Sequence, residues 1–445
     1  MTFVHTRTRL AAPNQYRPIC MRLDILRGPI ARGTIRTTFV LGLRLFVQSG
    51  TLLIVARMLG PQQFGAFAGI SALAVILGTL STFGTHIVLI ERVSLDHSTR
   101  RDILAYAIPT TMVCGGLLFG IYLLVALLAL PEIGITSGML VIIGITELLL
   151  QPLYSIPIAG RLAAGQVARS QSMHIFPLAL RLVTAVSVFA WAPANPLAVY
   201  LVGYLVATLV ALVFATATTP DCWPSIRHWR LPDRRELRHA GGYAASTFTS
   251  NGPGELDKTM AAKLLPLAAA GLYSAGARVI GAATLPVAAM MLSAVPRLFR
   301  EGRAQPGRTA RLLRWVFGST LAYSLVLAGV LWLLAPFFGW IFGPRYHGLD
   351  NMVRWLCPAV PGLALRLVAG TVLVTLDKPW LRVGYEIVGL LVLALAAYVL
   401  STRIGEVGMP VALALSEWVM AAIGIGLIAS ARHTEQRDVN AKESV

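Results

Sequence analysis

The feature that most constrains this chain is a series of long apolar runs, each near the length that a helix needs to cross a bilayer. A crossing takes about 20 apolar residues. Eleven such runs occur, at 35–58, 64–90, 105–130, 136–159, 171–192, 197–217, 270–294, 311–342, 352–376, 381–401 and 409–430. Only 13% of the residues are charged, against about 25% in soluble domains. A chain of this kind cannot cover itself with a water-facing surface, so we expect an all-α, polytopic membrane protein.

Basic residues occupy alternate loops between the apolar runs. They are concentrated in 1–33, 91–101, 161–169 and 227–238, whereas 131–135 and 193–196 contain no lysine or arginine. Cytoplasmic loops carry the excess of basic residues in membrane proteins, so we expect the N-terminus in the cytoplasm. The net charge of +18 then reflects topology and contact with anionic lipids, and no nucleic-acid partner is expected.

The same rule predicts a twelfth span in the polar segment 240–265. With only one span between residues 238 and 297, the next basic cluster would lie on the wrong side; it comprises Arg297, Arg300, Arg303 and Arg308. A further crossing restores the pattern and places both termini in the cytoplasm. A polar span is tolerated only where it faces protein or a water-filled cavity. The alternative is an interfacial loop. We further expect Pro253 and Gly254 to interrupt this helix.

A short pattern recurs in the two halves of the chain at a constant offset of 206 residues. A cation, a leucine, a glycine and an aromatic residue occur at Arg57, Leu59, Gly65 and Phe67, and again at Lys263, Leu265, Gly271 and Tyr273. Chance similarity of two apolar stretches is the alternative. A true repeat predicts two parallel six-helix halves. The expected division is a basic tail (1–33), the first half (34–217), a basic linker (218–239), the second half (240–430) and a C-terminal tail (431–445).

Three stretches resemble the bacterial polysaccharide-biosynthesis transporters, the O-antigen and exopolysaccharide flippases of the multidrug/oligosaccharidyl-lipid/polysaccharide superfamily. They read ARMLGPQQFGAFAGISALAVILGTLSTFG at 56–84, LDKTMAAKLLPLAAAGLYSAGARV at 256–279 and FFGWIFGPRYHG at 337–348. The resemblance implies two six-helix bundles around a central cavity. It also implies an inner-membrane protein that moves a polyprenyl-pyrophosphate-linked oligosaccharide by alternating access, with the polysaccharide polymerase machinery as a partner. The chain departs from the family at Pro266 and Leu267, which replace a Gly-Pro turn, and in its long basic N-terminal tail.

Such a substrate needs cations in a hydrated cavity, and arginine suits phosphate because its planar fork donates two parallel hydrogen bonds. The candidate substrate-binding residues are Arg44, Gln48, Arg57, Arg181, Asn251, Lys258, Lys263, Arg278 and Arg366. Arg57, Lys263 and Arg278 lie near predicted span ends, where snorkelling to the headgroups is the alternative. Arg44, Arg181 and Arg366 lie deeper.

Acidic residues inside the spans are candidates for binding a coupling proton or cation. They are Glu147, Glu255, Asp257, Glu386 and Glu417, and Asp257 is the preferred candidate. Because Lys258 follows Asp257 directly, a structural ion pair between the two is an equally good interpretation.

The sequence also argues against an enzyme. It contains no G-x-x-x-x-G-K-[ST] loop and no H-E-x-x-H motif, and its four cysteines are far apart, so no nucleotide, cofactor or metal is expected. The predicted outer loops are too short to hold a membrane-enzyme active site. Two transporter alternatives stay open: a cation-coupled drug antiporter of the same superfamily, and a lipid II flippase.

Overall fold

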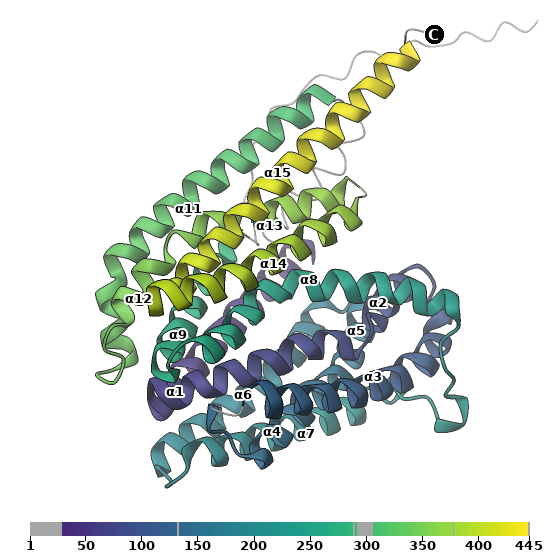
Figure 1. The fold of residues 1–445 in the computed structure, drawn as a ribbon. Helices are drawn as coiled ribbons and strands as arrows, with labels where there is room; N and C mark the ends of the chain where they lie inside the picture. The colour runs from purple at the N-terminus through teal and green to yellow at the C-terminus, as the bar shows by residue number, and fades with distance from the viewer. Residues whose placement is uncertain (1–28, 131–132, 288–289, 292–305, 377, 444–445) are drawn as a thin grey trace, which may run out of the picture.

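The computed structural model describes residues 29–130, 133–287, 290–291, 306–376 and 378–443, and its regular structure there is helical (Figure 1). The first half contains α1 (Pro29–Ser81), α2 (Thr85–Leu95), α3 (Arg100–Ala129), α4 (Ser137–Gly144), η4 (Ile145–Leu150), α5 (Gln151–Ala163), α6 (Val167–Trp191) and α7 (Pro196–Thr218). The second half contains α8 (Arg234–Leu264), α9 (Leu267–Ala283), α11 (Pro306–Phe342), α12 (Leu349–Leu356), α13 (Ala359–Thr375), α14 (Pro379–Ile404) and α15 (Gly408–Glu443). Short 3-10 turns lie at His97–Thr99, Pro220–Cys222, Ile226–His228 and Gly405–Val407.

Most of the predicted spans are visible as long apolar helices. In the described part of the chain, seven helical stretches are long and apolar enough to cross a membrane, or eight if the bent pair α12–α13 is one span. Two of these stretches each hold two helices: Gly42–Ser81 is broken at Gly60, and Trp380–Ala431 contains both α14 and α15. We count each of these two stretches as two spans and the bent pair α12–α13 as one span. With α8 and α9 added, the helices then correspond to the twelve predicted spans.

The outer surfaces of the long helices match a lipid environment. Leu128 on α3 and Leu333 on α11 are 74% and 79% exposed, and many other large apolar side chains on these helices are also exposed. Contiguous apolar surface on this scale is rare in water-soluble proteins. The chain is therefore a multi-pass membrane protein.

The polar segment 240–265 forms the larger part of α8, which is a single continuous helix from Arg234 to Leu264. The predicted interruption at Pro253 and Gly254 is therefore wrong. Proline removes one backbone hydrogen bond, but neighbouring helices compensate for this in membrane proteins. Here Pro253 is buried, and Gly252 beside it packs near the side chains of Leu390 and Ile76. These contacts hold the helix together across the proline.

The two halves meet where the recurring pattern places a glycine in each. A Cβ atom added to Gly65 would lie 2.7 Å from the backbone nitrogen of Gly271, and one added to Gly271 would overlap the backbone of Pro61. Close backbone approach of this kind requires glycine. Gly60 has a φ of 72° and separates the two helices within α1, while Pro266 separates α8 from α9. The break thus recurs at equivalent positions in the two halves.

The two bundles contact one another at one end and diverge at the other (Figure 1). At the contacting end, Tyr346 donates a hydrogen bond of 2.9 Å to the carbonyl oxygen of Ala56, and the Nε of Arg57 donates one of 2.7 Å to that of Ile341. The helices α8 and α9 lie between the bundles, and both contact α1. We call the end with Gly65 and Gly271 the closed end, and the opposite end, which carries the basic loops, the basic-loop end.

Cysteine labelling tests whether α8 crosses the membrane. In a variant without native cysteines, we expect Ala268→Cys and Arg235→Cys, at opposite ends of α8, to react with a membrane-impermeant thiol reagent from opposite sides. Labelling of both from the same side would make α8 an interfacial helix and remove the basis of the two-half architecture.

Candidate functional site

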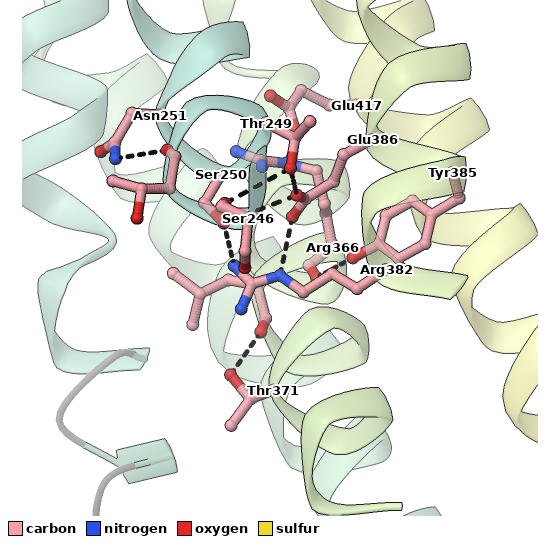
Figure 2. Close-up of polar contacts among 12 residues, drawn as sticks. Ser246, Thr249, Ser250, Asn251, Arg366, Thr371, Arg382, Tyr385, Glu386 and Glu417 are labelled. Carbon is pink, nitrogen blue, oxygen red and sulfur yellow. Dashed lines mark hydrogen bonds and ion pairs between the residues drawn. The ribbon is translucent and has the colours of Figure 1, made fainter. Parts of the chain in front are cut away.

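A polar network joins α8 to α14 inside the second half (Figure 2). The guanidinium of Arg382 donates to Glu386 at 2.9 Å and to the hydroxyl of Ser250 at 2.7 Å. The hydroxyl of Thr249 donates to the same carboxylate at 2.8 Å. Glu386 is only 1% exposed, and a buried charge is tolerated only when it is paired and hydrogen-bonded. The hydroxyl residues of α8 therefore stabilise an ion pair of α14.

A second buried ion pair joins α13 to α15. The Nε of Arg366 lies 2.6 Å from a carboxylate oxygen of Glu417, and Tyr385 donates a hydrogen bond of 3.4 Å to the backbone oxygen of Arg366 (Figure 2). The carboxylate of Glu417 is almost fully buried. Arg366, predicted to bind substrate, is thus engaged with an acid of its own half.

We expect removal of Arg366 alone to destabilise the protein more than removal of the whole pair. Arg366→Met leaves the buried carboxylate of Glu417 unpaired, which costs about 3–5 kcal/mol, whereas replacing both partners with apolar residues is often neutral. Unfolding of the purified protein in detergent should therefore shift strongly for Arg366→Met and much less for Arg366→Met/Glu417→Leu. Equal destabilisation by the single and double variants would contradict this account.

Lys258 of α8 is neutralised by acids of the same helix. Its Nζ lies 3.2 Å from Glu255 and 3.8 Å from Asp257, and it also donates to the backbone oxygen of Gly254. Asp257 in turn accepts a hydrogen bond of 2.9 Å from the hydroxyl of Tyr273 on α9. The structural pairing of Lys258 and Asp257 is therefore present. Roles of these residues in substrate or ion binding stay predictions.

The first half contains a separate cluster around Glu147. This residue lies in η4, a π-helical turn, and such turns are frequent at functional sites. Tyr204 of α7 donates a hydrogen bond to its carboxylate. The guanidinium carbon of Arg181, on α6, lies 3.8 Å from the centre of the Tyr204 ring, and its Nη2 donates to Thr208 at 3.1 Å. One predicted cation and one predicted acid are thus brought together.

Electrostatic interactions connect this cluster to the second half. Glu147 interacts electrostatically with Arg181 of its own half, and with Glu255 and Arg278 of the other. Within the described part of the chain, the Nε atoms of Arg181 and Arg278 are buried and have no hydrogen-bond partner. Each half therefore contributes one arginine with an unpaired Nε donor, and both act electrostatically on Glu147.

The other predicted residues lie on α1 and α8. Arg44 is half-buried on α1 and interacts electrostatically with His174 of α6, while Gln48 is exposed. Arg57 binds a backbone oxygen at the closed end, and Lys263 nearby is exposed. Asn251 is exposed, and its side-chain amide donates to the backbone oxygen of Thr247 (Figure 2). Their roles in substrate binding stay predictions.

Sequence reasoning gave no site role to Tyr204 or Arg382. Arg382 and Glu386 are four residues apart on one helix, a spacing that favours an ion pair, and this signal could have identified them. Tyr204 lies in an apolar run with no comparable signal.

Comparison with known proteins identifies this architecture. A solved structure described as an inward-facing conformation of a multidrug resistance MATE family transporter of the MOP superfamily matches with a TM-score of 0.72 and 12% identity, covering 89% of this chain and 99% of that one. An outward-facing conformation, described in the same terms, matches with a TM-score of 0.58 and 13% identity over 93% and 98%. A Pyrococcus furiosus MOP superfamily transporter, described as having a binding pocket of reverse polarity, matches with a TM-score of 0.63 and 12% identity over 94% and 99%.

The fold is thus that of a MOP superfamily transporter, with two helical halves, as predicted. The family described as polysaccharide biosynthesis protein matches residues 30–301. The chain belongs to this polysaccharide biosynthesis family, which confirms the resemblance noted in the sequence. No curated relative matches the sequence.

Proposed function

We propose that this protein translocates a polyprenyl-pyrophosphate-linked oligosaccharide across the bacterial inner membrane, for O-antigen or exopolysaccharide synthesis. The observation that carries the proposal is a pair of arginines whose Nε atoms are buried and unpaired, Arg181 from the first half and Arg278 from the second. Arginine is the side chain best suited to bind a pyrophosphate with paired hydrogen bonds. Family membership supplies the polysaccharide context.

The proposed cycle uses the divergence of the two bundles. The substrate approaches from the basic-loop end, which we take to be cytoplasmic, and its pyrophosphate binds between Arg181 and Arg278. Rocking of the halves then separates the closed end, where Gly65 contacts Gly271, and closes the basic-loop end. The larger TM-score to the inward-facing relative supports this assignment of sides.

The second candidate is a cation-coupled drug antiporter, because the solved relatives include multidrug transporters. A cationic drug needs an acid that is free to pair with it. Four acids of the spans already have a partner: Glu147 with Tyr204, Asp257 with Tyr273, Glu386 with Arg382 and Glu417 with Arg366. This arrangement favours an anionic substrate. A lipid II flippase would use the same pyrophosphate chemistry with a different headgroup.

Ligand-induced stabilisation separates the two candidates. A ligand that binds the folded state raises its stability in proportion to the logarithm of its concentration over Kd. We expect geranylgeranyl pyrophosphate to raise the melting temperature of the purified protein, and tetraphenylphosphonium to leave it unchanged. The control is Arg403→Ala, which removes an exposed arginine at the end of α14. This variant should still be stabilised by geranylgeranyl pyrophosphate. Stabilisation by the cation alone would favour the antiporter.

A further inference from the structure

A pocket of about 590 Å³ lies at the basic-loop end of the second half, where α8 and the corner between α13 and α14 form its walls. It is separate from the cluster around Glu147 and from the ion pair of Arg366. One wall is the first three turns of α8, from Arg235 to Ser246, and the other carries Val374, Trp380 and Val383. The two walls differ in chemistry.

The α8 wall is basic. Arg235 and Arg238 both line the pocket and are exposed, and neither makes a hydrogen bond or ion pair within the part of the chain that the structure describes. The neighbouring His239 is engaged with Glu91 of α2 at 2.8 Å. The acid nearest in sequence, Glu236, is held by Arg230 at 2.6 Å. The two arginines therefore keep their charge and all their donors for a ligand.

The opposite wall is apolar although it is open. Trp380, in the first turn of α14, is 67% exposed, and Val374 near the end of α13 is 40% exposed. Tryptophan is enriched at the level of the lipid headgroups. A free phosphate ion would use only the arginine side of such a pocket. A ligand that uses both walls must carry an anionic head and an apolar chain.

We propose that this pocket binds an anionic phospholipid, with its phosphate between Arg235 and Arg238 and its acyl chains along Val374, Trp380 and Val383. The inner leaflet of a membrane supplies such lipids beside basic segments. Because His239 ties the same part of α8 to α2, the bound lipid lies where α8 passes between the two halves. The proposal does not depend on which substrate the protein moves.

Native mass spectrometry of the delipidated protein, titrated with phosphatidylglycerol, tests the proposal. We expect saturable binding that weakens about tenfold or more in Arg235→Ala/Arg238→Ala, since two charge-assisted contacts are lost. Gly242→Leu fills the pocket without a change of charge, because the Cβ position of Gly242 is 3.7 Å from the ring of Trp380. It should weaken binding similarly.

The matched control is Arg311→Ala/Arg314→Ala, which removes the same charge from exposed positions on α11, and it should bind normally. Phosphatidylcholine should not compete. Equal loss of binding in the control pair would show a general charge effect and overturn the proposal. Unchanged binding in both pocket variants, or full displacement of the lipid by inorganic phosphate, would also overturn it.

Discussion

Replacement of both Arg181 and Arg278 by alanine is expected to reduce translocation at least about hundredfold, because each charge-assisted hydrogen bond contributes about 1.5–3 kcal/mol. Both arginines have a buried Nε atom without a partner in the described part of the chain, so each keeps at least one donor for the substrate. Polysaccharide export in cells that lack their own copy of the transporter measures the effect, with the amount of protein in the membrane determined in parallel.

Two further variants make this result specific. Lysine at both positions keeps the point charge but loses the planar fork, so partial export is expected. Arg403→Ala removes an exposed arginine of a second-half helix and should export normally. Normal export by the double alanine variant, present in the membrane at the normal level, would contradict the assignment.

Leucine at Gly271 is expected to prevent the closed end from forming. A Cβ atom at this position would overlap the backbone of Pro61, and backbone cannot move aside as a flexible side chain can. Overpacking costs about 1–3 kcal/mol, and a backbone overlap lies at the upper end of this range. The closed-end conformation should therefore lose about hundredfold in population, and transport should fall accordingly.

Distances between spin labels on the two halves measure this change. In Gly271→Leu, labels at the closed end should move apart, whereas the substitution Gly281→Leu provides the control. Gly281 lies on the same helix but has no atom within 4 Å of its Cβ position. Unchanged label distances with normal transport in Gly271→Leu would mean that the Gly65–Gly271 contact has no part in the cycle.

The spans could be predicted because two independent signals agree, the length of the apolar runs and the alternation of basic loops. The second signal identified α8, which apolar composition alone misses. Its continuity could not be predicted, because whether Pro253 breaks a helix depends on neighbours such as Leu390, which is far away in sequence.

The candidate site was predictable only in part. Because Arg181 and Arg366 lie deep within their predicted spans, both were expected to be shielded from water, and in the structure both are buried or nearly so. The ion pair of Arg366 with Glu417, 51 residues away in the chain, was not predicted. Such a partner cannot be recognised from spacing on one helix. Arg57 and Lys263 were correctly placed at equivalent ends of their helices, but that end is the contact between the halves.

Reconstitution tests the central claim most directly. Liposomes with and without the purified protein would carry a fluorescent polyprenyl-pyrophosphate-linked oligosaccharide, and membrane-impermeant dithionite would bleach the outward-facing probe. With the protein present, we expect dithionite to bleach nearly all of the fluorescent lipid, and not only the fraction in the outer leaflet. Liposomes that contain the Arg181→Ala/Arg278→Ala variant should behave like liposomes without protein. Bleaching that stops at the outer-leaflet fraction in the presence of folded protein would contradict the proposed translocation.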